Sequence, residues 1–263
     1  MNDLVSTTLE EALLTVTLNR PKKLNSITEP MAKELQWALD EANHNPDVRC
    51  LLLTGEGKAF CTGQALEEVI SKQDADEDYQ LEDTVRTSYN PVIRGIRYLE
   101  KPVVCAVNGV AAGAGANIAL ACDIVLASTE AKFVQAFSKI GLIPDSGGTF
   151  FLPRLVGLQR ANAMFMLDES VPAEKAEEIG LIYKSVEADA LMEKAREICA
   201  KLAFMPTRAF GLYKRAVNRS LQNNLDSQLN LEAELQTEAG STNDYWEGVQ
   251  AFLEKRDPEF KGI

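Results

Sequence analysis

The stretch Lys101–Asp123, KPVVCAVNGVAAGAGANIALACD, constrains the fold more than any other part of the chain. It opens with Val103–Val107, a short apolar run that is typical of a buried strand. Asn108-Gly109 breaks this run, and residues 113–116 carry no side chain larger than a methyl group. Residues Asn117–Ala121 then favour a helix, because alanine and leucine are strong helix formers. The stretch therefore predicts a strand, a tight turn and a helix.

A helix that begins without bulky side chains exposes backbone N–H groups that have no partner within the helix. Such a site suits an anionic oxygen, or an oxygen on which negative charge develops. A purely structural interpretation also stays open, since small residues let a helix pack tightly against its neighbours. A dinucleotide site fits poorly, because Gly113 and Gly115 start a G-x-G-x-x-G pattern whose third glycine position is Ile118.

Composition narrows the classes of protein. The chain has 263 residues, 46% hydrophobic and 25% charged, which is ordinary for one large soluble domain with or without a smaller appendage. The net charge of −12 argues against a nucleic-acid partner. The five cysteines are scattered without metal-binding spacing and indicate reduced thiols. The single histidine, His44, argues against a histidine metal site or a Ser-His triad. With no signal peptide and no apolar span of membrane length, we expect a cytoplasmic protein.

The N-terminal half alternates strands and helices. Residues Leu4–Leu18 predict two short strands joined by a turn near Glu11. Thr28 predicts the N-cap of a helix that runs to about Asn43, and Cys50–Thr54 predicts the next buried strand. A strand, a helix and a strand in this order favour a parallel α/β layer.

The later part of the chain changes in character. The acidic run Ser71–Asp83 predicts either a disordered segment or a surface helix, and Val85–Glu100 resumes helical spacing. From Ala188 onward the pattern is almost wholly helical. We therefore predict an α/β core over residues 1–200 and a helical C-terminal segment over residues 201–263. Such a segment can cover a partner subunit or a neighbouring site.

Several stretches, taken in their order along the whole chain, resemble the crotonase (enoyl-CoA hydratase/isomerase) family. They are LNRPKKLNSIT, LLLTGEGKAFCTGQAL, KPVVCAVNGVAAGAGANIALACDIVLAS, AKFVQAFSKIGLIPDSGGTFFLPRLVG, AEKAEEIGLIYKSV and EGVQAFLEKRDPEF. The resemblance implies a spiral of ββα units with a helical C-terminal segment, assembled as a homotrimer or homohexamer. It also implies an acyl-CoA thioester substrate and no organic cofactor. An apolar helix face with Trp246, Val249 and Phe252 agrees with such an assembly.

In this family two backbone N–H groups hold the thioester oxygen. The resemblance places them on Gln64, after the glycine of the F-x-x-G motif, and on Ala114, in the turn that contains Gly113. Removing a proton beside a thioester drives negative charge onto its oxygen, and one fixed donor is typically worth about 2.7–4 kcal/mol. The side chains of Gln64 and Ala114 should then matter little. Ala65 stands where the family commonly has aspartate, which puts in doubt a local carboxylate contact but not the donor.

The acid–base residues depart from those of the hydratases, which use two glutamates to activate water. The corresponding positions are Asn117 and Phe137, neither of which accepts a proton at neutral pH. Asp145, in IPDSGGT, stands where isomerase branches of the family carry their carboxylate. By spacing alone Asp145 could cap a helix that begins near Ser146. With the resemblance, we assign it as the base that moves a proton between two carbons.

The isomerase assignment leaves the acyl group open. The motifs PDSGGT and GVAAGAGA most resemble the branch that converts a ring-epoxide of phenylacetyl-CoA into an oxepin, and a Δ3,Δ2-enoyl-CoA isomerase fits nearly as well. Apolar neighbours at Phe133, Phe137 and Leu142 could raise the pKa of Asp145. Three alternatives remain: a hydratase, a non-catalytic acyl-CoA-binding protein, and a dehalogenase with an aspartate nucleophile. The last of these also needs a histidine, for which the chain offers only His44.

The resemblance also suggests which residues touch the substrate. The acyl pocket should be formed by the Leu66–Val92 region with Phe137. Lysines at 22, 23 and 255 are candidates for the CoA phosphates, although each could equally belong to an ordinary solvated loop. The residues assigned to substrate binding are Lys22, Leu24, Ala65, Leu66, Gly113, Phe137, Leu142 and Lys255.

Overall fold

A six-stranded sheet forms the centre of the molecule, which the computed structural model describes from residue 3 to residue 263. Met1 and Asn2 of the predicted core lie outside the described residues. In spatial order the strands are β1 (Val5–Glu10), β2 (Leu13–Leu18), β3 (Cys50–Gly55), β5 (Val103–Val107), β7 (Ile124–Ser128) and β10 (Lys184–Val186). The first pair is antiparallel and the other neighbours are parallel. Strands β3 and β5 are buried along their whole length, which confirms what their apolar runs predict.

A second, smaller sheet stands at the ends of these strands. Its members are β4 (Ala59–Cys61), β6 (Val110–Ala112), β8 (Lys132–Val134) and β9 (Val171–Pro172). In three successive cases a strand of the large sheet turns directly into a strand of the small one, as β3 does into β4. This repetition is the spiral of ββα units that the resemblance implies. Strands β6 and β9 were not predicted, because two or three residues are too few to show a periodic pattern.

Helices cover the sheets and connect their strands. In the core they are α1 (Glu29–His44), α2 (Leu66–Ala75), α3 (Leu81–Thr84), α4 (Asn90–Tyr98), α5 (Ala114–Ala121), α6 (Gly148–Val156), α7 (Leu158–Met166), α8 (Ala173–Glu178) and α9 (Leu191–Ala203). The predicted cap of α1 is confirmed, because Thr28 Oγ1 accepts a hydrogen bond from the N–H of Met31. Residues 71–75 of the acidic run end α2 and residues 81–83 begin α3, so the surface-helix alternative is correct for these two parts, and a turn at residues 76–80 joins them. Just before α4 lies a π-helical turn, η2 (Val85–Tyr89), where the spacing predicts one continuous α-helix.

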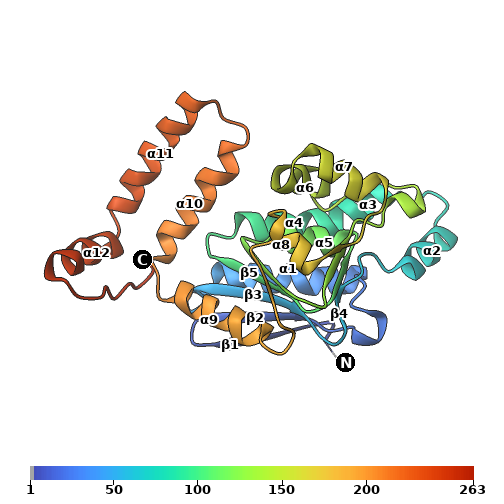
Figure 1. Cartoon of the computed structure of the whole chain (residues 1–263), viewed down its shortest axis with the longest axis horizontal. Coiled ribbons are helices and arrows are strands. Elements are labelled where there is room, and N and C mark those ends of the chain that lie inside the picture. Colours follow the sequence, from blue (N-terminus) through green and yellow to red (C-terminus); the bar gives the residue numbers. More distant parts are fainter. Residues whose placement is uncertain (1–2) are drawn as a thin grey trace.

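The last three helices extend away from the sheets, as Figure 1 shows: α10 (Thr207–Ser220), α11 (Leu225–Gly240) and α12 (Asn243–Glu254). Helix α9 crosses residue 200 and packs on β3, β5 and β7, so it belongs to the core in space. Helix α10 is fastened by Lys214, whose buried Nζ donates to the carbonyls of Ile96 and Lys101 and pairs with Asp123 at 2.7 Å. Within residues 3–263, no helix has the length and apolar character needed to cross a membrane.

Candidate active site

Two glycine-containing turns meet at the junction of the sheets. One follows β4 at Gly63, and the other precedes α5 at Gly113. A Cβ added to Gly63 would lie 3.0 Å from the carbonyl oxygen of Ala112 and 3.3 Å from the nitrogen of Ala114. A Cβ on Gly115 would lie 2.4 Å from the carbonyl oxygen of Cys61. The glycines are therefore required, and the fold brings Gln64 and Ala114 to adjoining turns.

Both proposed donors are free of the hydrogen bonds that hold these turns. Ile27 bridges to Gln64 in parallel fashion: the N–H of Ile27 donates to Gly63 at 2.7 Å, and the N–H of Ala65 donates to Ile27 at 2.9 Å. The N–H of Gln64 takes no part in this bridge. Ala114 is the first residue of α5, where an N–H has no carbonyl partner within the helix. The N–H groups of Gln64 and Ala114 are thus left without a partner in two adjoining turns.

A loop from the N-terminal hairpin supports the first turn. Leu24, at a φ of 51°, accepts a hydrogen bond from the N–H of Thr62 at 3.2 Å. The next residue, Asn25, is fully buried, and its Nδ2 donates to the carbonyls of Glu56 and Ala59. Asn25 is a supporting residue that the sequence analysis missed. Its signal was its residue type, because asparagine tolerates the left-handed conformation that its φ of 54° requires.

Asp145 lies in the loop between η3 (Ser138–Ile140) and α6. Helix α6 begins at Gly148, its N-cap is Gly147, and no side chain caps it, so the helix-capping alternative for Asp145 is wrong. Ser146 and Gly147 have successive positive φ values, 50° and 76°, which turn the chain sharply at this point. The carboxylate of Asp145 instead accepts a hydrogen bond from Ser146 Oγ at 3.0 Å.

Burial raises the pKa of Asp145 above its ordinary value. The hydrogen bond from Ser146 opposes this shift, because it stabilises the ionised form. A carboxylate with a raised pKa is a stronger base than one exposed to water. The environment of Asp145 therefore suits proton transfer.

The side chain of Asn117 has a structural role that the sequence does not indicate. It is fully buried, its Nδ2 donates to the backbone carbonyl of Asp145 at 2.9 Å, and its Oδ1 accepts from Gln135 Nε2 at 3.1 Å. Both ends of its side chain thus bind protein groups, and the amide holds the Asp145 loop in place. Gly148 leaves the room for it, because a Cβ there would lie 2.3 Å from Asn117 Nδ2.

An apolar wall adjoins the donors. A Cβ on Gly113 would lie 3.8 Å from Phe137 Cζ, which puts this ring beside the turn that ends in Ala114. Phe137 is 6% exposed, and its carbonyl accepts the N–H of Leu142 at 3.0 Å. Phe133 is fully buried in β8. The structure thus brings Gly113, Phe137 and Leu142 together around one face of the site.

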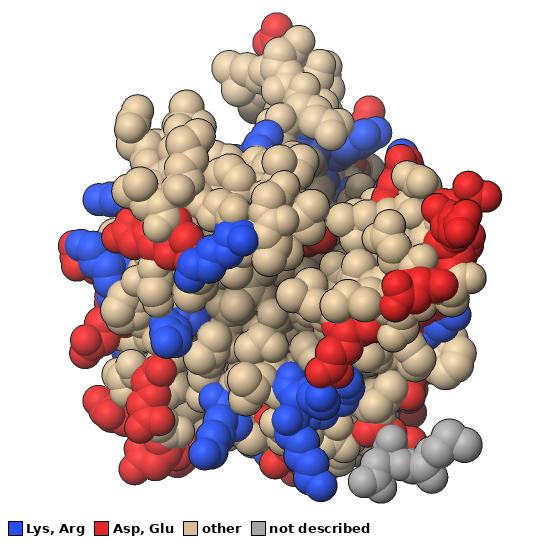
Figure 2. Space-filling model, turned by 90° about the vertical axis from the view of Figure 1, so that its right-hand side faces the viewer, with Lys and Arg blue, Asp and Glu red and all other residues tan. Residues whose placement is uncertain are grey.

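Of the remaining residues predicted to bind substrate, some lie near the donor turn and one lies far from it. Ala65 is the N-cap of α2 and Leu66, 49% exposed, is its first residue, so both follow the donor turn directly. Lys22 is exposed in η1 (Pro21–Lys23), and Leu24, the residue after η1, accepts the N–H of Thr62 just before the donor turn. On the face that carries α2, acidic side chains lie on both flanks and basic ones on the left and below, around a mostly uncharged middle (Figure 2). Lys255 is the C-cap of α12, and α12 and α2 lie at opposite ends of the molecule (Figure 1). Within a single chain, Lys255 is therefore far from the donor turns.

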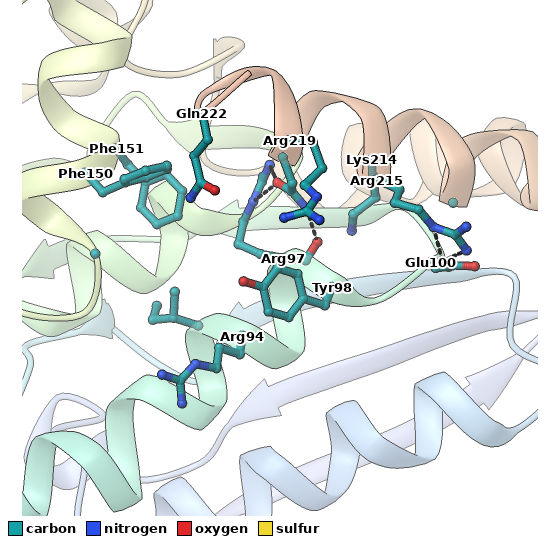
Figure 3. A pocket seen from close by; sticks show the side chains of 14 residues that line it. Arg94, Arg97, Tyr98, Glu100, Phe150, Phe151, Lys214, Arg215, Arg219 and Gln222 are labelled. Atoms are coloured by element: carbon teal, nitrogen blue, oxygen red, sulfur yellow. Dashed lines mark hydrogen bonds and ion pairs between the residues drawn. The ribbon is translucent and has the colours of Figure 1, made fainter. Parts of the chain in front are cut away.

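A basic cavity of about 490 Å³ lies apart from the two donor turns, between α4, α6 and α10 (Figure 3). Most of its charges already have partners. Arg97 binds Asn218 Oδ1 at 2.6 Å, and Arg215 pairs with Glu100 at 2.5 Å. These contacts join the core to α10, as the buried Lys214 does. We therefore attribute the charges of this cavity to the attachment of the C-terminal helices.

The contact at Gly63 yields a test of the donors. Gly63→Ala should lower kcat for any enolate-forming reaction about 10²–10³-fold, the loss expected when one oxyanion donor is displaced. The reason is that the new Cβ presses on the backbone of Ala112 and Ala114. Steady-state kinetics on a β,γ-enoyl-CoA ester provide the measurement.

Gly180→Ala is the matched control for that variant. Gly180 also has a positive φ, 75°, but a Cβ there would meet only Leu155 O at 3.8 Å. The control should lose stability through backbone strain and keep its kcat. Equal losses of kcat in the two variants would show that strain alone, and not the donor position, is responsible.

Comparisons with known proteins agree with this geometry. A family model described as enoyl-CoA hydratase/isomerase matches residues 8–263. The 1,2-epoxyphenylacetyl-CoA isomerase of Escherichia coli (strain K12) is 45% identical over 265 residues, covering 100% of both chains. A probable enoyl-CoA hydratase of Rhodobacter capsulatus is also 45% identical, over 97% of this chain and 96% of the relative. The crystal structure of an enoyl-CoA hydratase from Bacillus anthracis superposes with a TM-score of 0.90 at 33% identity, covering 99% of this chain and 100% of that one. The chain belongs to the enoyl-CoA hydratase/isomerase (crotonase) family.

Proposed function

We propose that this protein is an acyl-CoA isomerase that uses Asp145 as its single acid–base group. The proposal rests on which residues stand at the three positions where the family carries its acid–base groups. Asn117 is committed to buried amide contacts, Phe137 is apolar, and Asp145 alone can ionise. A reaction that returns one proton to the same substrate needs only one such group.

The proposed reaction balances within the substrate. The carboxylate of Asp145 takes a proton from a carbon of the acyl chain, and the electrons of the broken C–H bond delocalise onto the thioester oxygen. The N–H groups of Gln64 and Ala114 stabilise the resulting dienolate. Asp145 then returns the proton to a different carbon, the double bond shifts, and the carboxylate is regenerated. Phe137 and Leu142 keep water from the site, so that the proton is not exchanged.

Overall identity does not choose between isomerase and hydratase, because relatives at the same 45% carry one name of each kind. The site residues favour the isomerase. For the acyl group we propose the ring-epoxide of phenylacetyl-CoA, on the likeness to the Escherichia coli protein, with a simple β,γ-enoyl chain as a second substrate.

The experiment is turnover of two substrates by the purified protein. Ring-epoxidised phenylacetyl-CoA should give the oxepin, and trans-3-hexenoyl-CoA should give its 2-enoyl isomer, both followed by mass-resolved chromatography. Binding of both esters without turnover of either would instead favour a non-catalytic acyl-CoA-binding protein. A dehalogenase is disfavoured, since His44 is exposed at the end of α1 and pairs with Asp40.

We propose a cytoplasmic trimer or hexamer as the working form. Trp246, Val249 and Phe252 of α12 are all exposed in the single chain, with Phe252 83% exposed. Exposed aromatic groups of this kind mark protein contacts. Sedimentation at micromolar concentration should show the trimer or hexamer, and a stable monomer there would refute the assembly. The five free cysteines, all of them buried, agree with a reducing compartment.

A further inference from the structure

Tyr89 occupies an unusual position in the helix before α4. It is the last residue of the π-helical turn η2, in which the N–H of Asn90 donates to Val85, five residues back. Gln36 of α1 fixes this turn, because its Nε2 donates to the carbonyls of Thr87 and Ser88 at 3.0 and 3.1 Å. Single π-turns within helices occur frequently at functional sites, where they redirect a side chain. Hydrogen bonds from Gln36 thus stabilise the π-helical turn, and the turn determines the orientation of the Tyr89 side chain.

The hydroxyl of Tyr89 has no partner. The residue is 2% exposed, yet no group within residues 3–263 hydrogen-bonds with its Oη. In the described chain, the fully shielded side-chain atoms that lack a partner are Asn108 Oδ1 and Gln135 Oε1, so Tyr89 Oη is not sealed in the interior. Its small exposed area therefore includes the hydroxyl. Buried tyrosines usually find a partner for this group, so an open, unpaired one is available to a ligand.

The packing of two helices puts Tyr89 on the side of the donor turns. Tyr89 directly precedes α4, which packs on α5, and Arg97 Nη1 near the end of α4 donates to the carbonyl of Ala121 at the end of α5. The start of α4 therefore lies toward the same end of this helix pair as Ala114, the first residue of α5. Burial raises the pKa of Tyr89 well above its usual value, and the nearby charges of Asp145 and Glu68 add to the shift, as do Cys61 and Tyr79. The phenol consequently stays protonated. It can donate a hydrogen bond but cannot serve as a base.

We propose that Tyr89 selects acyl groups that carry an oxygen of their own, by donating a hydrogen bond to that oxygen. The inference rests on the proposed function and names the substrate class of the same site. The thioester oxygen already has Gln64 and Ala114, so a third donor near Asp145 suits a different oxygen, on the part of the acyl group where the proton moves. A site built to bind such an oxygen disfavours the analogue without it, because the buried donor is then left unpaired.

The test compares stable ligands that differ by one oxygen. Phenylacetyl-CoA and its 2-, 3- and 4-hydroxyphenyl analogues are titrated into the wild type and into Tyr89→Phe by calorimetry. The wild type should bind at least one hydroxylated ester about 3–10-fold more tightly than phenylacetyl-CoA, which is the ratio that one net hydrogen bond supplies. Tyr89→Phe should bind that ester and phenylacetyl-CoA equally. No preference in the wild type, or the same preference in the variant, would overturn the proposal.

Tyr79→Phe is the matched control. Tyr79 lies near the same helix, but its hydroxyl is already bound to Thr84 Oγ1 at 2.7 Å, so its removal should leave the ligand preference intact. Loss of the preference in this control as well would show a general effect of the segment and overturn the assignment to Tyr89.

Kinetics separate this inference from the proposed function. Tyr89→Phe should lose more kcat/KM on the ring-epoxide than on trans-3-hexenoyl-CoA, which has no oxygen in its chain. Equal losses on both would assign the hydroxyl to proton transfer and overturn the selectivity proposal. A wild type that binds these esters with the expected preference but turns over neither would refute the isomerase and leave the binding result standing.

Discussion

Asp145→Asn is expected to lower kcat for isomerisation at least about 10²-fold, and up to about 10⁴-fold, the usual worth of a general acid–base group. The affinity for acyl-CoA should survive, because Gln64 and Ala114 bind through backbone N–H groups that the substitution does not touch. The measurement is steady-state kinetics on trans-3-hexenoyl-CoA beside calorimetric titration of a non-isomerisable acyl-CoA. A variant that keeps more than about one-tenth of the wild-type rate would have lost less than about 1.4 kcal/mol, too little for an essential base.

Stability provides an internal check on this variant. The pKa of Asp145 is raised in the folded protein, so the carboxyl stabilises the fold most below its unfolded pKa and loses that contribution as the pH rises through the folded value. At neutral pH the native state therefore holds a desolvated charge at a cost. Asp145→Asn removes the charge and should melt at the same temperature as the wild type or higher.

Asp168→Asn is the matched control for a carboxylate. Asp168 is half-buried, as Asp145 is, but it is structural, since it accepts the N–H of Ala136 and pairs with Lys139. Its replacement should lower the melting temperature and leave kcat nearly unchanged. The opposite outcome for the pair, with Asp145→Asn unstable and active, would contradict the assignment.

The pH profile reports the same group. Isomerisation needs ionised Asp145, so kcat/KM should fall as the pH drops through the raised pKa and stay level above it. Ser146→Ala removes the hydrogen bond that opposes the shift, and should move this acid limb to higher pH. An acid limb that does not move would show that another group controls the rate.

Hydration of crotonyl-CoA is expected to be slower by several orders of magnitude than in a hydratase with two glutamates, because each missing acid–base group is worth about 10²–10⁴-fold. Hydration needs a water held in line with the β-carbon, a base for its proton and a proton for the α-carbon. Asn117 is bound to Gln135 and to the Asp145 carbonyl, and Phe137 presents an apolar ring. Loss of crotonyl-CoA absorbance at high enzyme concentration measures the rate.

Asn117→Glu tests the same explanation from the other side. Restoring one glutamate should not restore hydration, because the longer charged side chain would displace the amide contacts and meet Gly148, where a Cβ would already lie 2.3 Å from Asn117 Nδ2. We expect a less stable protein with impaired isomerisation. Substantial hydration by this single variant would show that the water site is intact and that only the carboxylate is missing.

Local chemistry explains what the sequence could predict of the fold. Thr28 marks the start of α1 because a hydroxyl cap acts within one turn, and Thr28 Oγ1 does accept the N–H of Met31. The almost wholly helical pattern predicted from Ala188 onward matches α9 to α12, since each of these helices extends over several turns. Strands β6 and β9 pair only through the fold, so nothing local signals them.

The candidate site also contains residues that the sequence could predict and contacts that it could not. Gln64, Ala114 and Asp145 were assigned from motifs, since each stands in a stretch that resembles the family. Asn117 contacts Gln135, 18 residues away, and the carbonyl of Asp145, 28 residues away. Helical or strand periodicity in the sequence cannot predict contacts over such separations. The spacing treats Tyr89 as part of an apolar helix face. Its open hydroxyl depends on the π-helical turn, which an α-helical period conceals.

The most direct test of the account is the fate of trans-3-hexenoyl-CoA in one reaction, resolved over time by mass spectrometry for the wild type and Asp145→Asn. The account predicts that the wild type accumulates trans-2-hexenoyl-CoA with only traces of the 3-hydroxyacyl ester, and that Asp145→Asn forms neither. If 3-hydroxyhexanoyl-CoA forms as fast as the isomer, or if Asp145→Asn still shifts the double bond at the wild-type rate, Asp145 is not a shuttle that moves a proton between carbons.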